Sequence, residues 1–259
     1  MPFTFSHPAI VLPATGLHKK YYSLSGLLIG SMVPDFEYFI RMRDYSKYSH
    51  TISGMFWFDI PLGIALLFLF HNVVRNILIR HLPYYLNTRF SVFEKFNWNE
   101  YFKNNTIIVI ISLLFGIASH LFWDSFTHDG EFFASHIPLL SNYYDIFNHE
   151  ISGAGIFQYV SSLLGGIVML LYVFSFPEGP NTRESNILYF WLLVSLITLM
   201  VLNIRLYLDY IYNDHHHEDI IVTIISGGLI GVTALSLYLN ESYKKQLNKK
   251  LEKIRNKAV

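Results

Sequence analysis

The sequence lacks cysteine and is poor in charged residues. Without cysteine, the chain of 259 residues can form neither a disulfide nor a thiolate metal site, so any metal ion must be held by nitrogen and oxygen atoms. Charged residues make up only 15% of the chain, whereas hydrophobic residues make up 52% and aromatic residues 17%. This balance is too apolar for an ordinary water-soluble domain of this length.

Other features are absent as well. The formal net charge is zero and no stripe of basic and aromatic residues is found, which argues against a nucleic-acid partner. The sequence has no Gly-rich phosphate loop, nucleophile elbow or dinucleotide-binding fingerprint. The N-terminus has no basic segment, and Pro8 and Pro13 interrupt its apolar residues, so we expect no cleavable signal peptide there.

The apolar residues occur in long blocks that contain few charges. This pattern predicts an all-α fold, a polytopic membrane helical bundle of about five or six membrane-embedded helices surrounded by lipid. Five blocks approach the roughly 20 residues that cross a bilayer: Gly54–Val74, Thr106–Trp123, Gly155–Phe176, Ile187–Tyr207 and Ile220–Leu239. A sixth block, Leu24–Ile40, is shorter and contains Pro34, so it could span, re-enter or pack against the others. Several glycines in the blocks are expected to allow close helix contacts, namely Gly165, Gly166, Gly227, Gly228 and Gly231.

The distribution of lysine and arginine predicts the orientation. The connection after the first long block is basic, residues 125–154 and 209–219 contain no lysine or arginine, and the tail after residue 239 is again basic. The positive-inside rule then places residues 75–105 and the C-terminus in the cytoplasm, and residues 125–154 and 209–219 outside. Arg41, Arg43 and Lys47 fall on the outer side, which leaves the topology of the first fifty residues open.

We see no internal repeat or linker. The simplest organisation is a single membrane domain over residues 1–243, followed by a basic cytoplasmic tail over residues 244–259 that suits a surface amphipathic helix. Residues 215–218, a run of three histidines and a glutamate, are expected to form a solvated loop or to capture metal loosely.

Three polar residues recur every four positions at the end of one apolar block. In the segment GIASHLFWDSFTHDG they are His120, Asp124 and His128, and on a helix this spacing places them on one face. Ionisable side chains are costly in lipid unless they face protein, water or a metal. Two imidazoles and a carboxylate suit zinc, manganese or iron. The alternative is that the histidines cap the helix end and Asp124 bonds a neighbouring helix.

Further candidates lie near the N-terminus. His7 lies in the apolar opening segment, Asp35 and Glu37 follow Pro34 at a predicted turn, and His50 precedes the next long block. Each of these alone also fits an ordinary position at a helix end or in a loop. Together the candidates form a set of nitrogen and oxygen ligands at the margins of apolar segments, which one or more metal ions would require: His7, Asp35, His50, His120, Asp124 and His128.

Four segments carry a family resemblance: MPFTFSHPA, GSMVPDFEYF, SHT followed by FDIPLG, and FGIASHLFWDSFTH. They resemble an uncharacterised family of bacterial integral membrane proteins. More distantly they are similar to inner-membrane proteins classed as metal-dependent hydrolases, which pair an N-terminal His with a PDxD-type turn, a THS-like segment and HxxxD. The resemblance is dense over residues 1–130 and implies location in the bacterial cytoplasmic membrane. The matching positions are His7, Asp35, His50, His120 and Asp124.

The chain departs from the hydrolase pattern at two points. Glu37 stands where the pattern has a second Asp, and the HRGxTHS segment is reduced to SHT, with one histidine instead of two. The number of ligands is therefore open.

Two functions follow from these residues. The first is a membrane-embedded metal-dependent hydrolase acting on phosphoester or lipid-linked substrates, in which a divalent metal, zinc or else manganese or iron, lowers the pKa of a water and Glu37 accepts its proton as the catalytic residue. The alternative is a non-catalytic membrane protein, a transporter-like or structural bundle, in which the same residues line a polar cavity or bind metal. Geometry discriminates between them, since a metal site requires the ligands to lie in one sphere.

Overall fold

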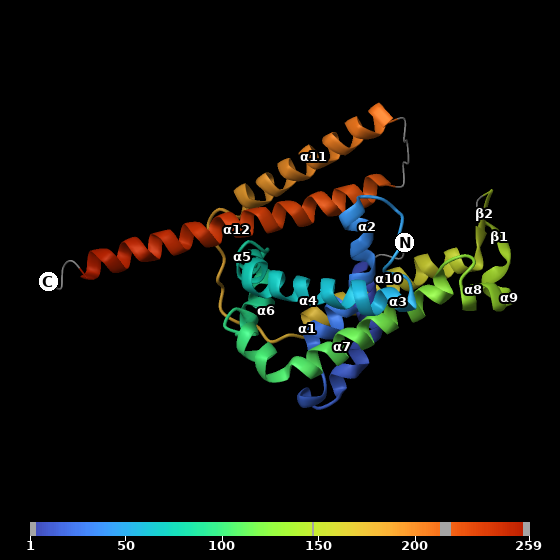
Figure 1. Ribbon diagram of the computed structural model, residues 1–259, viewed down its shortest axis with the longest axis horizontal. Helices are drawn as coiled ribbons and strands as arrows, with labels where there is room; N and C mark the ends of the chain where they lie inside the picture. The colour runs from blue at the N-terminus through green and yellow to red at the C-terminus, as the bar shows by residue number, and fades with distance from the viewer. Residues whose placement is uncertain (1–3, 147, 213–218, 256–259) are drawn as a thin grey trace. The chain divides into compact units, whose positions relative to one another are not determined.

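The computed structural model describes residues 4–146, 148–212 and 219–255, and these are predominantly helical (Figure 1). The α-helices are α1 Leu24–Gly30, α2 Phe36–Arg41, α3 Ile52–Gly54, α4 Ile60–Leu69, α5 Arg75–Arg80, α6 Tyr84–Phe90, α7 Trp98–Thr127, α8 Phe132–His136, α9 Pro138–Ser141, α10 Gly153–Phe174, α11 Ile187–Tyr212 and α12 Asp219–Arg255. Shorter 3-10 helices cover Thr4–Gly16, Lys19–Tyr21, Val33–Asp35 and Ser91–Phe93, and π-helical turns cover Met55–Asp59 and Phe70–Val74. The described strands, β1 Tyr143–Ile146 and β2 His149–Ser152, form an antiparallel pair. The predicted all-α class is confirmed.

Five helical segments are long and apolar enough to cross a membrane. They are Ile52–Arg80, Trp98–His136, Gly153–Phe174, Ile187–Tyr212 and Asp219–Tyr243. Their apolar side chains are widely exposed, as at Leu163 and Leu188, which are 67% and 88% accessible. Surface of this kind requires lipid around it. The chain is therefore an integral membrane protein, and the five long blocks of the sequence correspond to these five segments.

The sixth block does not form a continuous helix. Its residues form α1, the 3-10 helix Val33–Asp35 and α2, and Pro34 lies where the first helix has ended. Proline cannot donate a backbone hydrogen bond and disfavours helical geometry in the residue before it. The block therefore does not span as one continuous helix, and α1 packs along α7.

The chain divides into two compact units. The first contains residues 1–67 and 97–176, and the second contains residues 68–96 and 177–259. The single membrane domain expected over residues 1–243 stays a prediction, as does the tail, whose expected start at residue 244 falls inside α12. Residues 215–218, the histidine run, lie outside the described residues.

The first unit is built around α7. Asn97 caps this helix by accepting a hydrogen bond from the backbone N–H of Glu100. On one side α7 packs against α1 through facing glycines. The N-terminal 3-10 helix Thr4–Gly16 packs against α10, where Ser6 donates a hydrogen bond to the Ser162 carbonyl oxygen at 2.7 Å. These contacts bring His7 and α1 to the same helix, α7, although they lie far from it in the sequence.

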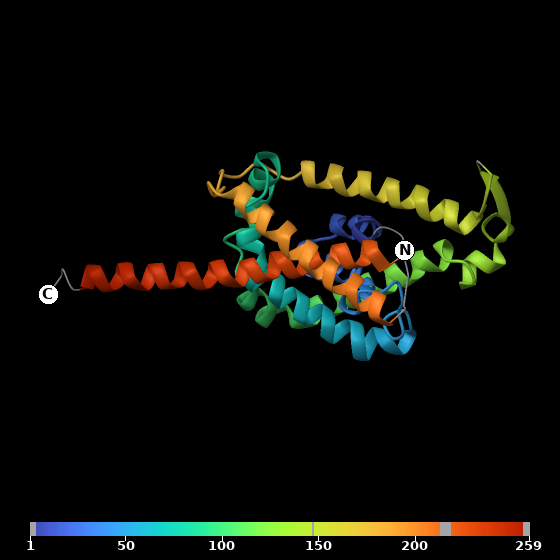
Figure 2. The same cartoon turned by 90° about the horizontal axis from the view of Figure 1, so that it is seen from above.

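In the second unit α11 lies alongside α12, as both views show (Figures 1 and 2). Arg205 of α11 pairs with Asp209 one turn on, and also with Asp219 at the start of α12, at 3.1 Å. All three side chains are largely buried, so the ion pairs hold the ends of the two helices together.

The predicted glycine contacts are confirmed at four of the five positions. Added Cβ atoms at Gly227 and Gly231 would lie within 3.2 Å of Thr198 and Val194, and one at Gly165 would lie 2.9 Å from Ser6. Gly166 is in ordinary contact with Ser6. The prediction is wrong for Gly228, because a Cβ there meets nothing within 4 Å.

We predict that Gly116→Ala destabilises the protein. A Cβ at Gly116 would lie 2.5 Å from the Leu27 carbonyl oxygen, which is backbone and cannot move aside. Overpacking of this kind costs about 1–3 kcal/mol, more than the roughly 1 kcal/mol that alanine gains over glycine in a helix. Thermal unfolding of the detergent-solubilised protein, followed by circular dichroism, should show a lower midpoint. The control Gly228→Ala should leave the midpoint unchanged or raise it, and a rise in both variants would contradict the prediction.

Candidate metal centre

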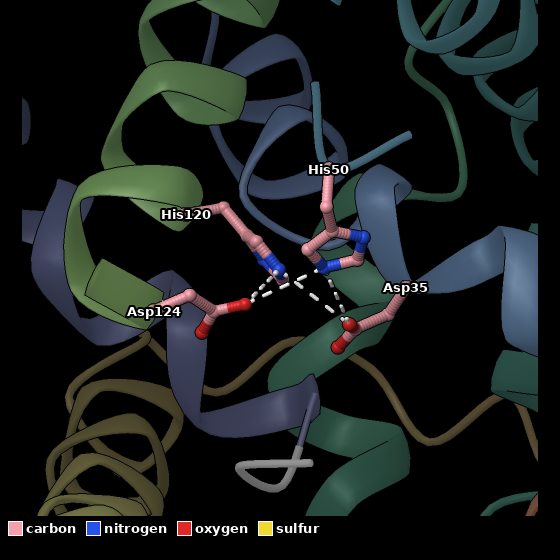
Figure 3. A group of neighbouring side chains, drawn as sticks. All are labelled: Asp35, His50, His120 and Asp124. Carbon is pink, nitrogen blue, oxygen red and sulfur yellow. Dashed lines mark ion pairs between the residues drawn. The ribbon is translucent and has the colours of Figure 1, made fainter. Parts of the chain in front are cut away.

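Four candidate side chains from three segments of the first unit point toward one another (Figure 3). His120 and Asp124 lie one turn apart on α7, Asp35 ends the 3-10 helix Val33–Asp35, and His50 lies in the connection between α2 and α3. His120, Asp124 and Asp35 are at most 5% exposed, whereas the His50 side chain is 21% exposed. The helical spacing seen in the sequence does place His120 and Asp124 on one face.

The four facing atoms are spaced like ligands of one ion. They all lie within 4.8 Å of one another. His120 Nε2 is 3.2 Å from Asp124 Oδ2 and 3.5 Å from Asp35 Oδ1, and His50 Nε2 is 3.4 Å and 3.7 Å from the same two oxygens. In a tetrahedral zinc site with bonds of about 2.0–2.1 Å, neighbouring ligand atoms lie about 3.3–3.4 Å apart. The four nitrogen–oxygen distances, 3.2–3.7 Å, are close to the edges of such a tetrahedron.

These atoms are also without ordinary hydrogen bonds. Within the described part of the chain, His50 Nε2, His120 Nε2 and both oxygens of Asp124 are buried and have no hydrogen-bond partner. Buried polar groups are normally paired, and a buried carboxylate without a partner costs several kcal/mol. A divalent cation would satisfy all of these atoms at once, so the residues present fit a metal ion with nitrogen and oxygen ligands.

The histidines are held by their other ring nitrogens. Nδ1 of His120 donates a hydrogen bond to the Ser31 carbonyl oxygen at 2.8 Å, which leaves Nε2 with the free lone pair. Nδ1 of His50 lies 3.0 Å and 3.1 Å from the hydroxyl oxygens of Ser49 and Ser46. Both rings therefore present Nε2 to the cluster, and an outer hydrogen bond of this kind is typical of metal-binding histidines.

Both carboxylate oxygens of Glu37 are already engaged in hydrogen bonds. It accepts hydrogen bonds from the Arg41 guanidinium, the Ser46 hydroxyl and three successive backbone N–H groups, those of Lys47, Tyr48 and Ser49. Burial works to raise the pKa of Glu37, but the backbone donors and Arg41 outweigh it and lower the pKa to about 2. Glu37 thus fixes the loop that ends at His50. Its predicted role as proton acceptor stays a prediction.

His7 and His128 lie beside the four-residue cluster. The His7 ring stacks on His120, with ring centroids 3.9 Å apart, and its Nε2 is 3.6 Å from Asp124 Oδ1. Nδ1 of His128 is 3.8 Å from the same oxygen. The other five residues predicted as ligands are therefore gathered around Asp124, and the role of all six as ligands stays a prediction.

Charge and protonation at this site suit a cation. Burial, followed by the neighbouring His120, lowers the pKa of His7 to about 3, so its imidazole is neutral near pH 7. Burial works to raise the pKa of Asp35, but its interaction with His120 outweighs burial and leaves the pKa below its usual value. A neutral imidazole and an ionised carboxylate are the forms that bind metal.

Sequence analysis did not select Asp59. This residue ends the π-helical turn Met55–Asp59, which packs against both α7 and the 3-10 helix Val33–Asp35. Its side chain is fully buried, and within the described residues neither carboxylate oxygen has a hydrogen-bond partner. The signal was available, because FDIPLG places a carboxylate within an otherwise apolar block.

A sequence model of the family described as "Domain of unknown function (DUF4184)" matches residues 1–237. No curated protein and no solved structure matches the chain.

We predict that Glu37→Gln lowers the affinity for zinc about 10–100-fold, the usual effect of removing an outer-shell contact. The amide cannot accept from all five donors, so the loop that carries His50 loses its fixed position. Competition with a chromophoric chelator measures the affinity. The control Glu100→Gln changes an exposed glutamate of α7 and should leave the affinity unchanged. Equal affinities of wild type and Glu37→Gln would show that the loop is held in another way.

Proposed function

The chain belongs to the DUF4184 family, whose function is unknown, and from the geometry of its own site we propose that it is a membrane-embedded metal-dependent hydrolase. One observation carries the proposal. Four ligand atoms from three separate segments lie within 4.8 Å of one another, and those of His50, His120 and Asp124 are buried without a hydrogen-bond partner in the described chain.

Zinc is the metal that we propose, with manganese or iron as substitutes. Two imidazole nitrogens and two carboxylate oxygens, without cysteine, are ligands that zinc accepts in a tetrahedral arrangement. The distances between the ligand atoms fit zinc bonds. His7 and His128 lie beside Asp124 Oδ1, the carboxylate oxygen that does not face His50 and His120.

The chemistry that we propose is hydrolysis. A divalent ion held by these four residues would acidify a water molecule taken up as a fifth ligand, as some zinc sites do, and would polarise a phosphoryl or carbonyl oxygen. Asp35 can accept the proton, because its Oδ1 faces the two imidazoles while its buried Oδ2 has no hydrogen-bond partner among the described residues. We assign Glu37 the role of positioning His50, since its two oxygens already accept from five donors.

A phosphoester, in particular one carried on a lipid, is the substrate class that fits the location. His50 directly precedes the spanning segment Ile52–Arg80, and Asp124 lies near the end of α7 within Trp98–His136. The site therefore lies at the end of two membrane segments, near the depth at which lipid headgroups meet water. His50, the most exposed of the four side chains, gives access to it.

The test combines metal analysis with turnover. We expect the purified protein to contain zinc, manganese or iron, and His120→Ala to lose it. The matched control is His81→Ala in the second unit, because His81 is also fully buried and its Nδ1 also donates to a backbone carbonyl oxygen, that of Ile77 at 2.7 Å. His81 stacks on Phe190 rather than on a histidine, so this variant should keep the metal.

Activity is measured on a chromogenic phosphodiester and on phospholipid vesicles. We expect hydrolysis that a chelator abolishes, that added zinc restores and that His120→Ala lacks. A protein that binds metal but hydrolyses neither substrate would favour the non-catalytic alternative, a membrane bundle with a metal-binding cluster. A protein without metal would contradict the proposed function itself.

We also propose that the protein lies in the bacterial inner membrane with its C-terminus in the cytoplasm and residues 125–154 outside, from the distribution of lysine and arginine. The cysteine-free chain makes this directly testable. In intact cells, an impermeant maleimide should label Asn142→Cys, whereas it should label Lys250→Cys only after the membrane is opened. The reverse pattern would invert the topology.

A further inference from the structure

The two oxygens of Asp124 face different histidines. Oδ2 faces His50 and His120, whereas Oδ1 faces His7 and His128. We propose that Asp124 is a bridging carboxylate and that the site holds a second metal ion, bound by His7, His128 and Asp124 Oδ1. This proposal deepens the proposed hydrolase function and rests on it.

His7 carries the main argument. Its side chain is 1% exposed, and within the described part of the chain neither ring nitrogen has a hydrogen-bond partner. An imidazole normally satisfies at least one nitrogen when it is buried this deeply. Its Nε2 is 3.6 Å from Asp124 Oδ1, close to the separation of two ligands on one ion, yet His7 is not among the residues whose atoms gather around the first position. A ligand role at a separate position accounts for both facts.

The chain fixes His7 at this place. The neighbouring Ser6 donates to the Ser162 carbonyl oxygen, and Gly165 of α10 leaves room for the Ser6 backbone. Trp123 lies edge-on to the His7 ring, with centroids 6.1 Å apart. The imidazole is therefore held against Asp124 by packing, although no hydrogen bond in the described chain holds its nitrogens.

His128 completes the second position and opens it to water. Its side chain is 31% exposed, and its Nδ1 lies 3.8 Å from Asp124 Oδ1. The same nitrogen lies 3.3 Å from the Asp124 carbonyl oxygen and 3.3 Å from the Thr127 hydroxyl oxygen, contacts that a bound metal ion would replace. The first position has four protein ligands and is nearly closed, whereas the second has three and borders solvent. Catalytic metal sites keep such an open coordination position.

The arrangement specifies the substrate more closely. Paired ions about 3.5–4 Å apart, bridged by one carboxylate, are used by enzymes that displace a group at phosphorus, because the two charges stabilise both the attacking and the leaving oxygen. The second position, being open, is where a phosphoryl oxygen would bind. A phosphate ester is therefore favoured over a carboxylic ester.

Metal stoichiometry tests the bridge. The apo-protein in detergent is titrated with Co²⁺ and then Zn²⁺, and the bound metal is counted per chain. We expect two equivalents for the wild type, the second weaker, and one equivalent for both His7→Ala and His128→Ala. His7 is buried, so His7→Ala could lose metal by misfolding, whereas His128 is partly exposed and its replacement disturbs packing less. Loss of one equivalent in both variants is therefore not explained by misfolding. The control His136→Ala, an exposed histidine of the same outer segment, should keep both equivalents.

Mn²⁺ gives an independent measurement. Electron paramagnetic resonance of the wild type should show a spin-coupled pair, and His7→Ala should show an isolated ion. One equivalent in the wild type, retained in His7→Ala, would overturn the second position and leave the proposed function standing. Loss of all metal in His7→Ala and His128→Ala alike would also overturn it, because both histidines would then serve a single ion. Absence of metal from the wild type would instead contradict the proposed function.

Discussion

The close approach of α1 and α7 is the contact on which the site depends. Gly30 and Gly116 face each other so closely that a Cβ on either would reach the backbone of the other helix. This approach brings the Ser31 carbonyl oxygen, at the end of α1, within 2.8 Å of His120 Nδ1. Because Pro34 and Asp35 follow shortly after α1, the same contact also positions the turn at Pro34 and the Asp35 side chain. One contact between small residues therefore orients His120 of α7 and positions Asp35 from another segment.

The polar groups around the site are hydrogen-bonded, whereas in the described chain those at its centre are not. Around it, polar groups are paired: Glu37 has five donors, and the outer nitrogens of His120 and His50 have partners. At its centre, the described residues leave the facing nitrogens and the Asp124 oxygens without hydrogen bonds. Folding of the surrounding shell holds these atoms together at a cost in stability, so a metal ion bound to them would also stabilise the first unit.

The sequence predicted the membrane class, because runs of apolar residues are a local property, and it predicted that His120 and Asp124 share a face, because that follows from helical spacing. It did not determine whether residues 24–40 span, since Pro34 breaks the block but does not say where the pieces pack. The five donors on Glu37 and the isolation of Asp59 depend on contacts between segments, which spacing along the chain does not encode. The division into two units is likewise a matter of packing.

Every candidate ligand lies between residues 7 and 128, although the described chain continues to residue 255. During synthesis, therefore, the full set of ligands has been made when about half of the chain has left the ribosome. The helices α10, α11 and α12 are still to follow at that moment. Residues 68–96 of the second unit are already present then, so the segments that carry the six side chains can meet while residues 177–259 of that unit are not yet made.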